Sequence, residues 1–455
     1  MSTTTQVPRT TTTAEADAGG LKRVISRRML LIFVVGDILG TGIYALVGEV
    51  AGEVGGAVWT SFAVAFALAF ITAFAYAELV TKYPHAAGAA LYTHKAFKRP
   101  FFTFMVAFAV MASGIASASA AARAFGGDYL STFVELPVVL VALLFVGLLA
   151  AINFRGISES IKVNLGLTLI ELGGLLLIIV IGAAVLFNGD GDAGRAFEFK
   201  EGTSVPFAIM GGAALAFYAL IGFEDSVNVA EETRDPSRAF PPALFGGLVI
   251  TALVYFAVTF TASLVVPTER LADSSAPLLE VVEAGPLSIP PRLFSLIALV
   301  AITNTALINM IMASRLTYGM GRQGVVPRVF SRVHRQRKTP WVGIAFTTLL
   351  AVALVTTGEV ETLADTTVVL LLAVFVVVNI SVLVLRRDPV EHDHFRAPTI
   401  LPVLGALVCV ALMTQQEGEI FARAGILLLV GAGLYGINYL VAGRTPELDA
   451  KELSK

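Results

Sequence analysis

Long apolar segments recur along the whole chain with short polar segments between them, and this pattern limits the folds that are open to it. A helix needs about 20 mostly apolar residues to cross the hydrocarbon core of a bilayer. Only 15% of the 455 residues are charged, whereas a soluble domain carries roughly 25%. The sequence therefore predicts an all-α integral membrane protein. Twelve segments are predicted to span the membrane: 29–52, 57–79, 101–123, 136–153, 158–187, 205–230, 241–266, 291–318, 341–357, 363–386, 398–415 and 420–442.

The positive charges predict which side of the membrane each loop faces, because loops rich in Lys and Arg stay on the cytosolic side. With the N-terminus inside, 26 of the 32 Lys and Arg lie in cytosolic segments. Both termini are therefore predicted to be cytosolic, in a multi-pass protein of the cytoplasmic membrane. Residues 1–27 lack the apolar stretch of a signal peptide. They and residues 443–455 are expected to be disordered cytosolic tails.

The first apolar segment contains three glycines and an acid at mid-membrane depth, namely Gly36, Asp37, Gly40 and Gly42. Glycine frees the backbone, and a break near Gly40 would expose peptide groups that lipid cannot satisfy. Such groups would need a polar ligand. The alternative is that small residues only let helices pack closely, and this segment alone leaves both interpretations open.

The sixth apolar segment repeats this pattern five segments later, with Gly222, Glu224 and Asp225 inside an apolar run. Glycine-interrupted segments at matching positions of two halves indicate an inverted-repeat transporter with its site at the midplane. We predict discontinuous helices at Gly40 and Gly222 and count both residues as substrate-binding positions. The predicted units are 28–187 (spans 1 to 5), 204–387 (spans 6 to 10) and 398–442 (spans 11 and 12).

The two breaks would suit the two charged ends of an amino acid. N–H groups at the start of a half-helix attract a carboxylate, and free C=O groups at the end of a half-helix attract an ammonium or a metal cation. We assign the N–H groups of Thr41 and Gly42, with the Thr41 hydroxyl, to the carboxylate. We assign the C=O groups of Ile38, Tyr218 and Ile221 to the amine.

At these residues the chain resembles the amino acid-polyamine-organocation superfamily, whose members share the LeuT-type repeat of five plus five helices. The resemblance covers spans 1 to 10, and four motifs in the right order make it specific. The motifs are Gly36-x-x-x-Gly40-Thr41-Gly42-Ile43; Tyr76-Ala77-Glu78-Leu79 with Pro84; Gly222-Phe223-Glu224 with Glu231 to Arg238; and Ser314 to Arg322 with Pro327.

The resemblance implies transport by alternating access, with spans 1, 2, 6 and 7 moving against spans 3, 4, 8 and 9. It also implies an aromatic gate beside the substrate, for which Tyr218 and Phe217 are the candidates. The alternative for both rings is ordinary packing in the protein core.

Glu171 in the fifth span is a candidate for coupling transport to an ion. Proton-coupled bacterial relatives carry a lysine at this point after a Lys-Val-Asn stretch, which here is Lys162-Val163-Asn164. The glutamate leaves three options: a carboxyl that binds a proton, a carboxylate that binds a cation such as Na⁺, or an exchanger without a coupling ion. We favour the proton. A structural bond to a neighbouring helix is the alternative role of Glu171.

Three more polar residues within the spans are candidates for coupling or gating, because ionisable groups at this depth are costly and face a cavity or a partner. Glu224 resembles the family acid that links the substrate site to the inner gate. Asp37 would either recognise a second amine or bond the unwound backbone beside it. Asn304 lies near the expected wall of a cation site.

The function predicted from these features is proton-coupled transport of an amino acid, and the alternative is a polyamine or cationic amino acid carrier or exchanger. No filter sequence suggests a channel and no catalytic motif suggests an enzyme. Neither a cofactor nor a metal site is expected. A net charge of −2 gives no sign of nucleic-acid binding. A disulfide-linked partner subunit is not expected, because the single cysteine, Cys409, lies in an apolar segment.

Overall fold

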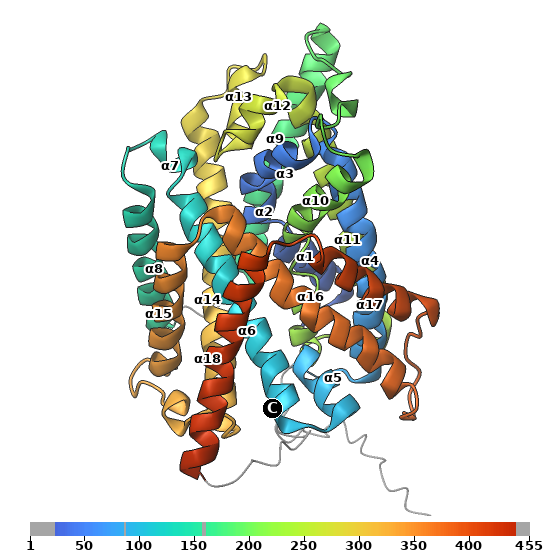
Figure 1. The fold of residues 1–455 in the computed structure, drawn as a ribbon, viewed down its shortest axis with the longest axis vertical. Coiled ribbons are helices and arrows are strands. Elements are labelled where there is room, and N and C mark those ends of the chain that lie inside the picture. The colour runs from blue at the N-terminus through green and yellow to red at the C-terminus, as the bar shows by residue number, and fades with distance from the viewer. Residues whose placement is uncertain (1–22, 86–87, 157–160, 443–455) are drawn as a thin grey trace, which may run out of the picture.

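The chain folds into a bundle of helices, shown in Figure 1. The structure is a computed structural model that describes residues 23–85, 88–156 and 161–442. Within these ranges it contains helices and no strands, apart from one isolated β-bridge. The α-helices are α1 (Arg27–Ile38), α2 (Thr41–Ala45), α3 (Val47–Val54), α4 (Val58–Lys82), α5 (Gly88–Phe97), α6 (Pro100–Phe125), α7 (Asp128–Ser131), α8 (Val138–Arg155), α9 (Ile161–Asn188), α10 (Val205–Tyr218), α11 (Pro236–Val265), α12 (Thr268–Ala272), α13 (Pro277–Ala284), α14 (Pro291–Arg322), α15 (Trp341–Thr357), α16 (Val360–Leu385), α17 (Ile400–Met413) and α18 (Gly418–Ala442). The 3₁₀ helices are η1 (Arg195–Phe197), η2 (Asp225–Val229) and η3 (Arg328–Ser331).

Nine helical segments in the described ranges are long and apolar enough to cross a membrane, judged by length and composition. Three shorter apolar helices, α10, α15 and α17, fall on the other predicted spans. Helices suit such sequences because a helix satisfies its backbone N–H and C=O groups internally. Most helix ends lie within a few residues of the predicted span ends, and part of the predicted span 158–187 falls outside the described residues. The seventh helix, α11, begins five residues before the predicted 241 and continues through Pro241 and Pro242.

The interruption predicted near Gly40 is present. Helix α1 ends at Ile38, Leu39 is extended, and the next helix begins at Thr41. The segment α2 is short and is followed almost directly by α3, since the Val50 N–H bonds to the Leu46 C=O. The first predicted span, 29–52, is therefore a helix broken near its middle.

The second predicted interruption is also present, but it is longer than one glycine requires. Helix α10 ends at Tyr218, and the chain then makes turns until the 3₁₀ helix η2 begins at Asp225. Gly222 lies in these turns with a φ of +125°, a backbone conformation that side chains with a Cβ rarely adopt. The structure thus places a left-handed glycine at the centre of the break.

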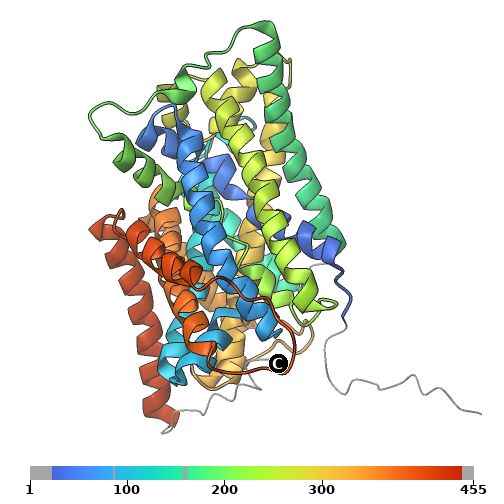
Figure 2. The same cartoon turned by 90° about the vertical axis from the view of Figure 1, so that its right-hand side faces the viewer.

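The helices form two groups that meet around α1, α9 and α16. Helices α4, α10 and α11 contact one another or α1, and helices α6, α8, α14 and α15 form a second set of contacts. Helix α9 touches both groups, through α11 and through α14. Figure 2 shows α18 at the edge of the bundle opposite α9. We call the end of the bundle that carries α5 the α5 end, at the bottom of Figure 1.

The structure differs from the predicted tail 1–27 at its last residues. Ile25 forms a parallel β-bridge with Thr233, in which its N–H donates to the Glu232 C=O and its C=O accepts from Arg234. Ile25 is buried. The entry to α1 is therefore fixed to the segment that leads into α11; the tail up to residue 22 and the tail 443–455 lie outside the described residues.

A buried ion pair fixes the segment between α16 and α17 to the end of α4. Arg386 donates from Nε and Nη2 to the two carboxylate oxygens of Glu78, at 2.9 and 2.7 Å. Glu78 also accepts from the Ala397 N–H, and Arg386 also donates to Thr399. The two side chains are 11% and 2% exposed. Glu78 of the second motif therefore pairs with Arg386, which follows the end of α16.

Loss of Arg386 is expected to destabilise this end strongly, because Glu78 would be left buried without its partner. The Arg386→Ala variant should lose roughly 3–5 kcal/mol of stability, measured as a lower thermal unfolding midpoint of the purified protein. Arg238→Ala is the matched control, since among the described residues Arg238 forms only an exposed pair with Asp235, and such pairs contribute less than about 1 kcal/mol. Equal midpoints for the two variants would contradict the role given to this pair.

Candidate functional site

A cavity of about 670 Å³ lies between the two groups of helices, where the broken segments meet. Its wall combines residues of α1, α2, α6, α14 and α16 with the turns between α10 and η2. It continues toward the α5 end, because Gly88 of α5 and Arg322 at the end of α14 also line it. Among the described lining residues none belongs to α3, α12 or α13 at the opposite end. The cavity is therefore accessible from one end of the bundle.

Ten of the twelve predicted site residues line this cavity, which brings together positions up to 267 residues apart in the chain. They are Asp37, Ile38, Gly40, Thr41, Gly42, Tyr218, Ile221, Gly222, Glu224 and Asn304. The two that do not line it are Phe217 and Glu171. The structure shows that these ten residues lie together around one cavity. The roles assigned to them remain predictions.

The two breaks touch each other through their glycines. A Cβ on Gly42 would lie 2.5 Å from the Ala219 Cα, and a Cβ on Gly222 would lie 2.5 Å from the Asp37 carbonyl oxygen. Real Cβ atoms do not approach other atoms so closely. Close packing and an interrupted helix were alternatives for the glycines in the sequence, and in the structure the same glycines provide both.

The expectation that the peptide groups at the breaks are unpaired is wrong for several of them. The Thr41 N–H donates to the Thr305 hydroxyl at 3.2 Å, although the two residues are 264 positions apart. The Gly222 N–H donates to the Glu224 carboxyl at 2.9 Å, and the Ile38 C=O accepts from the Tyr255 hydroxyl at 2.9 Å. Side chains from other helices thus satisfy the Thr41 N–H and the Ile38 C=O, which we had assigned to the substrate. Glu224 satisfies the Gly222 N–H within its own segment.

Other groups at the breaks do remain available in the described part of the chain. The Gly42 N–H and the Ile221 C=O have no hydrogen-bond partner there. The Thr41 hydroxyl is also without a partner, and Thr41 is only 1% exposed. The Tyr218 C=O accepts only a long bond from the Ile221 N–H, at 3.3 Å. Two donors, the Gly42 N–H and the Thr41 hydroxyl, and two acceptors, the Ile221 and Tyr218 C=O groups, are therefore left for a ligand. Such a ligand would carry both an acceptor and a donor group.

Tyr218 and Phe217 are neighbours in sequence but have different surroundings. The Tyr218 hydroxyl lies 3.0 Å from the Ser117 hydroxyl of α6, and both residues line the cavity. The Phe217 ring packs against Phe375 of α16, with 6.1 Å between ring centroids. For Phe217 the packing alternative is the one that the structure supports, so its assignment to the cavity is corrected.

Glu171 lies behind the cavity wall and not in it. The Asn304 side chain, which does line the cavity, donates to Glu171 Oε1 at 3.1 Å. Glu171 is fully buried, and its Oε2 has no hydrogen-bond partner among the described residues. The Tyr44 hydroxyl donates to the Glu171 backbone C=O and fixes this turn of α9. Asn304 is therefore the contact between the cavity and the buried carboxyl.

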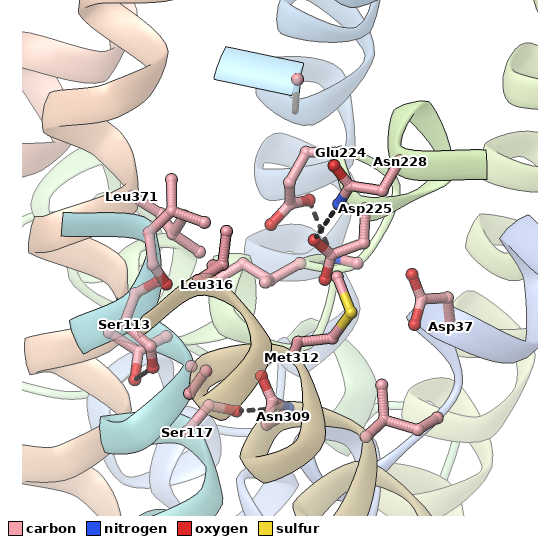
Figure 3. Close-up of a pocket in the computed structure, with 18 of the residues that line it drawn as sticks. Asp37, Ser113, Ser117, Glu224, Asp225, Asn228, Asn309, Met312, Leu316 and Leu371 are labelled. Carbon is pink, nitrogen blue, oxygen red and sulfur yellow. Dashed lines mark hydrogen bonds between the residues drawn. The ribbon is translucent and has the colours of Figure 1, made fainter. Parts of the chain in front are cut away.

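Three acidic residues line the part of the cavity next to the breaks. Figure 3 shows Glu224 and Asp225 together and Asp37 beside them, across the cavity from Ser113 and Ser117. Asp225 accepts from the Asn228 amide at 3.3 Å. Neither Glu224 nor Asp225 has an ion pair with a Lys, Arg or His in the described ranges. This wall consequently favours positively charged groups in the cavity.

The sequence did not identify the residues of α6 and α14 that face the cavity. Ser113, Ser117 and Asn309 line it and form part of its polar surface. On α14, Thr305, Asn309 and Met312 share one helix face by their spacing. No pattern in the sequence indicates that this face, and not another, points inward, since polar residues such as Thr303 and Ser314 lie on the opposite side of α14. Within the described residues, no cluster of three or more His, Cys, Asp and Glu could hold a metal ion.

Helices apolar enough to span a membrane, broken around a polar cavity, define a multi-pass membrane transporter. The family described as Amino acid permease matches residues 25–423, nearly the whole described chain. The chain therefore belongs to this family, within the amino acid-polyamine-organocation superfamily.

Curated relatives are similar to the chain over most of its length. The methylthioribose transporter of Bacillus subtilis is 25% identical over 452 residues, which cover 94% of this chain and 96% of the relative. The branched-chain amino acid permease BcaP of the same species is 25% identical over 444 residues, covering 91% and 92%. The low-affinity putrescine importer PlaP of Escherichia coli is 27% identical over 377 residues, covering 78% and 81%.

Proposed function

We propose that this protein is a secondary active transporter that carries an amino acid across the cytoplasmic membrane by alternating access. One observation carries the proposal: the two broken segments meet at the closed end of a cavity, and within the described part of the chain this cavity is accessible only from the α5 end of the bundle. A carrier holds its substrate between two barriers and opens one of them at a time, whereas a channel needs a path from both ends. The single-sided cavity supports the carrier.

The proposal includes a LeuT-type architecture of twelve spans. The nine long helices together with α10, α15 and α17 give that number. Segments α1 to α9 and α10 to α16 form the two halves of five spans, and each half begins with a broken helix. The Lys and Arg distribution assigns the α5 end to the cytosol, with both termini there. The cavity then opens inward, which corresponds to the state that releases substrate.

The available groups at the breaks support a substrate with a carboxylate and an amine. The Gly42 N–H and the Thr41 hydroxyl are donors for the carboxylate, and the Ile221 C=O is an acceptor for the amine. The Thr305 hydroxyl occupies the Thr41 N–H, so a bound carboxylate either displaces Thr305 or binds beside it. The second lone pair of the Ile38 carbonyl remains for the amine.

Proton coupling through Glu171 is part of the same proposal. A fully buried carboxyl with one hydrogen-bonded and one free oxygen is stable when it carries a proton, because a buried charge without a partner is costly. Asn304 connects this carboxyl to the cavity, so the state of the substrate site can change the surroundings of the proton. The alternative to proton coupling is coupling to a Na⁺ ion that binds to the Glu171 carboxylate.

A polyamine or cationic amino acid is the second candidate substrate, and the acidic wall of Asp37, Glu224 and Asp225 favours it. The substrates named for these relatives, methylthioribose, branched-chain amino acids and putrescine, do not decide between the candidates. Uptake of labelled leucine into proteoliposomes, with arginine and putrescine as competitors at several pH values, separates them. Absence of uptake and exchange for every amino acid and amine would refute the proposed function.

The Thr41 hydroxyl gives a test of the carboxylate site. The Thr41→Val variant keeps the shape of the side chain and removes the hydroxyl, so the KM for an amino acid should rise about tenfold, as expected when a hydrogen bond to a charged group is lost. The maximal rate should change less. Thr356→Val, at an exposed position where the hydroxyl bonds only to its own helix, is the control. An unchanged KM for Thr41→Val would refute this assignment.

A further inference from the structure

The orientation of the Asn309 side-chain amide is fixed by its neighbours. Its Nδ2 donates to the Thr305 backbone C=O at 3.0 Å and to the Ser117 hydroxyl at 3.4 Å. A backbone carbonyl only accepts hydrogen bonds, so the nitrogen and not the oxygen must face it. Asn309 lines the cavity, and no described residue donates to its Oδ1. In Figure 3 the amide nitrogen is the atom bonded to Ser117. The group left for a ligand is therefore the amide oxygen, a hydrogen-bond acceptor.

Two further hydroxyl groups in the cavity wall, those of Ser113 and Thr367, also turn their protons away from the cavity. Ser113 donates to the Val110 C=O of its own helix at 2.8 Å. Thr367 donates to the Leu363 C=O at 3.0 Å. Each hydroxyl has one proton, so the part that remains for a ligand is a lone pair. Both residues line the cavity.

The hydroxyl groups of Ser117 and Tyr218 can donate their protons to groups within the protein. Ser117 and Tyr218 are 3.0 Å apart, and the Tyr218 hydroxyl also lies 3.4 Å from the Ser117 backbone C=O. A Ser117 hydroxyl that donates to Tyr218, with Tyr218 donating to that C=O, accounts for both protons. Ser117 then accepts from Asn309. In this arrangement Asn309, Ser113, Ser117 and Thr367 present acceptors to a ligand.

We propose that Asn309 is a specificity-determining residue that selects substrates whose far end donates a hydrogen bond, as an amine, guanidinium or hydroxyl group does. The inference rests on the proposed function and specifies its substrate class. A substrate that placed a carboxylate or an amide oxygen beside Asn309 would bring one hydrogen-bond acceptor against another. An apolar end would leave the Asn309 oxygen without a donor and displace the water that can bond it.

The α6 backbone keeps this acceptor accessible. A Cβ on Gly114 would lie 3.2 Å from Asn309 Oδ1, so any side chain there would crowd the oxygen. Glycine at this position leaves room for a ligand group beside the amide. Gly114→Ala is consequently a second way to weaken the site, one that leaves Asn309 and its hydrogen bonds in place.

The test uses pairs of ligands that differ by one donor group: lysine and norleucine, homoserine and 2-aminobutyrate, putrescine and butylamine. Each competes for uptake by the full-length protein in proteoliposomes, and each is tested for thermal stabilisation of the purified protein. We expect the donor-bearing member of at least one pair to bind at least about tenfold more tightly, since a site built to hydrogen-bond a group rejects the analogue that lacks it. Asn309→Leu and Gly114→Ala should reduce this ratio to about one to threefold, with the affinity for the apolar member unchanged or higher.

Asn309→Asp is the conservative variant that keeps an acceptor oxygen, and it should retain the preference for amines. If Asn309→Leu does not fold, Asn309→Asp and Gly114→Ala still test the role of the acceptor oxygen. Gly147→Ala in α8, where no other atom lies within 4 Å, is the control for Gly114→Ala. Equal affinity for both members of every pair in the wild type, or a preference that persists in Gly114→Ala and Asn309→Leu, would overturn the inference while leaving amino acid transport intact. Failure of every amino acid and amine to bind would overturn the proposed function itself, and this inference with it.

Discussion

Replacement of Gly222 by alanine is expected to reduce uptake to below a tenth of the wild-type rate. Gly222 has a φ of +125°, and an L-residue in a left-handed conformation costs roughly 1–2 kcal/mol. The added Cβ would also lie 2.5 Å from the Asp37 carbonyl oxygen. The two broken segments would have to separate, and the groups that we assign to the substrate would separate with them. Initial rates in proteoliposomes, at equal amounts of inserted protein, measure the effect.

Gly147→Ala is the control for this prediction as well. Gly147 lies within α8, where a Cβ would meet no atom within 4 Å, and alanine favours a helix over glycine by about 1 kcal/mol. Its uptake should be that of the wild type. Normal uptake by Gly222→Ala would mean that the contact between the breaks has no part in transport.

The second large effect is expected for Glu171→Gln. Glutamine retains the oxygen that accepts from Asn304 and replaces the proton-binding oxygen by an amide that cannot release a proton. Accumulation driven by a pH gradient should fall more than tenfold, whereas exchange of internal for external substrate should continue. The measurement compares the two modes in the same proteoliposomes, with internal pH followed by a fluorescent dye.

Two comparisons make the Glu171 prediction specific. Glu53→Gln changes a half-exposed carboxylate near Lys200 by the same chemistry and should leave accumulation unaltered. A sodium gradient that drives wild-type uptake without proton movement would replace the proton by the competing cation. If Glu171→Gln accumulates substrate normally under a pH gradient, then Glu171 is only a structural partner of Asn304.

The sequence alone determined most of the secondary structure and both interruptions. Length and hydrophobicity are local properties, and a helix in lipid satisfies its own backbone, so the spans could be predicted without knowledge of their neighbours. Gly40 and Gly222 could be recognised because a glycine beside an acid deep in an apolar run is itself unusual. The motifs around Glu78 and Arg322 identified the family for the same reason: they are contiguous in the chain.

Only the tertiary structure decided which groups at the site are free and which way the side chains point. Phe217 and Tyr218 are adjacent and both aromatic, yet one packs against Phe375 and the other lines the cavity. The Thr41 N–H is satisfied by Thr305 across 264 residues, and the Asn309 amide nitrogen, oriented by the Thr305 C=O of its own helix, also donates to Ser117 of α6. A helix such as α14, whose polar residues lie on more than one side, contains no periodic signal of its facing direction. That direction is set by contacts with distant helices, and so is the hydrogen-bond polarity of the cavity they enclose.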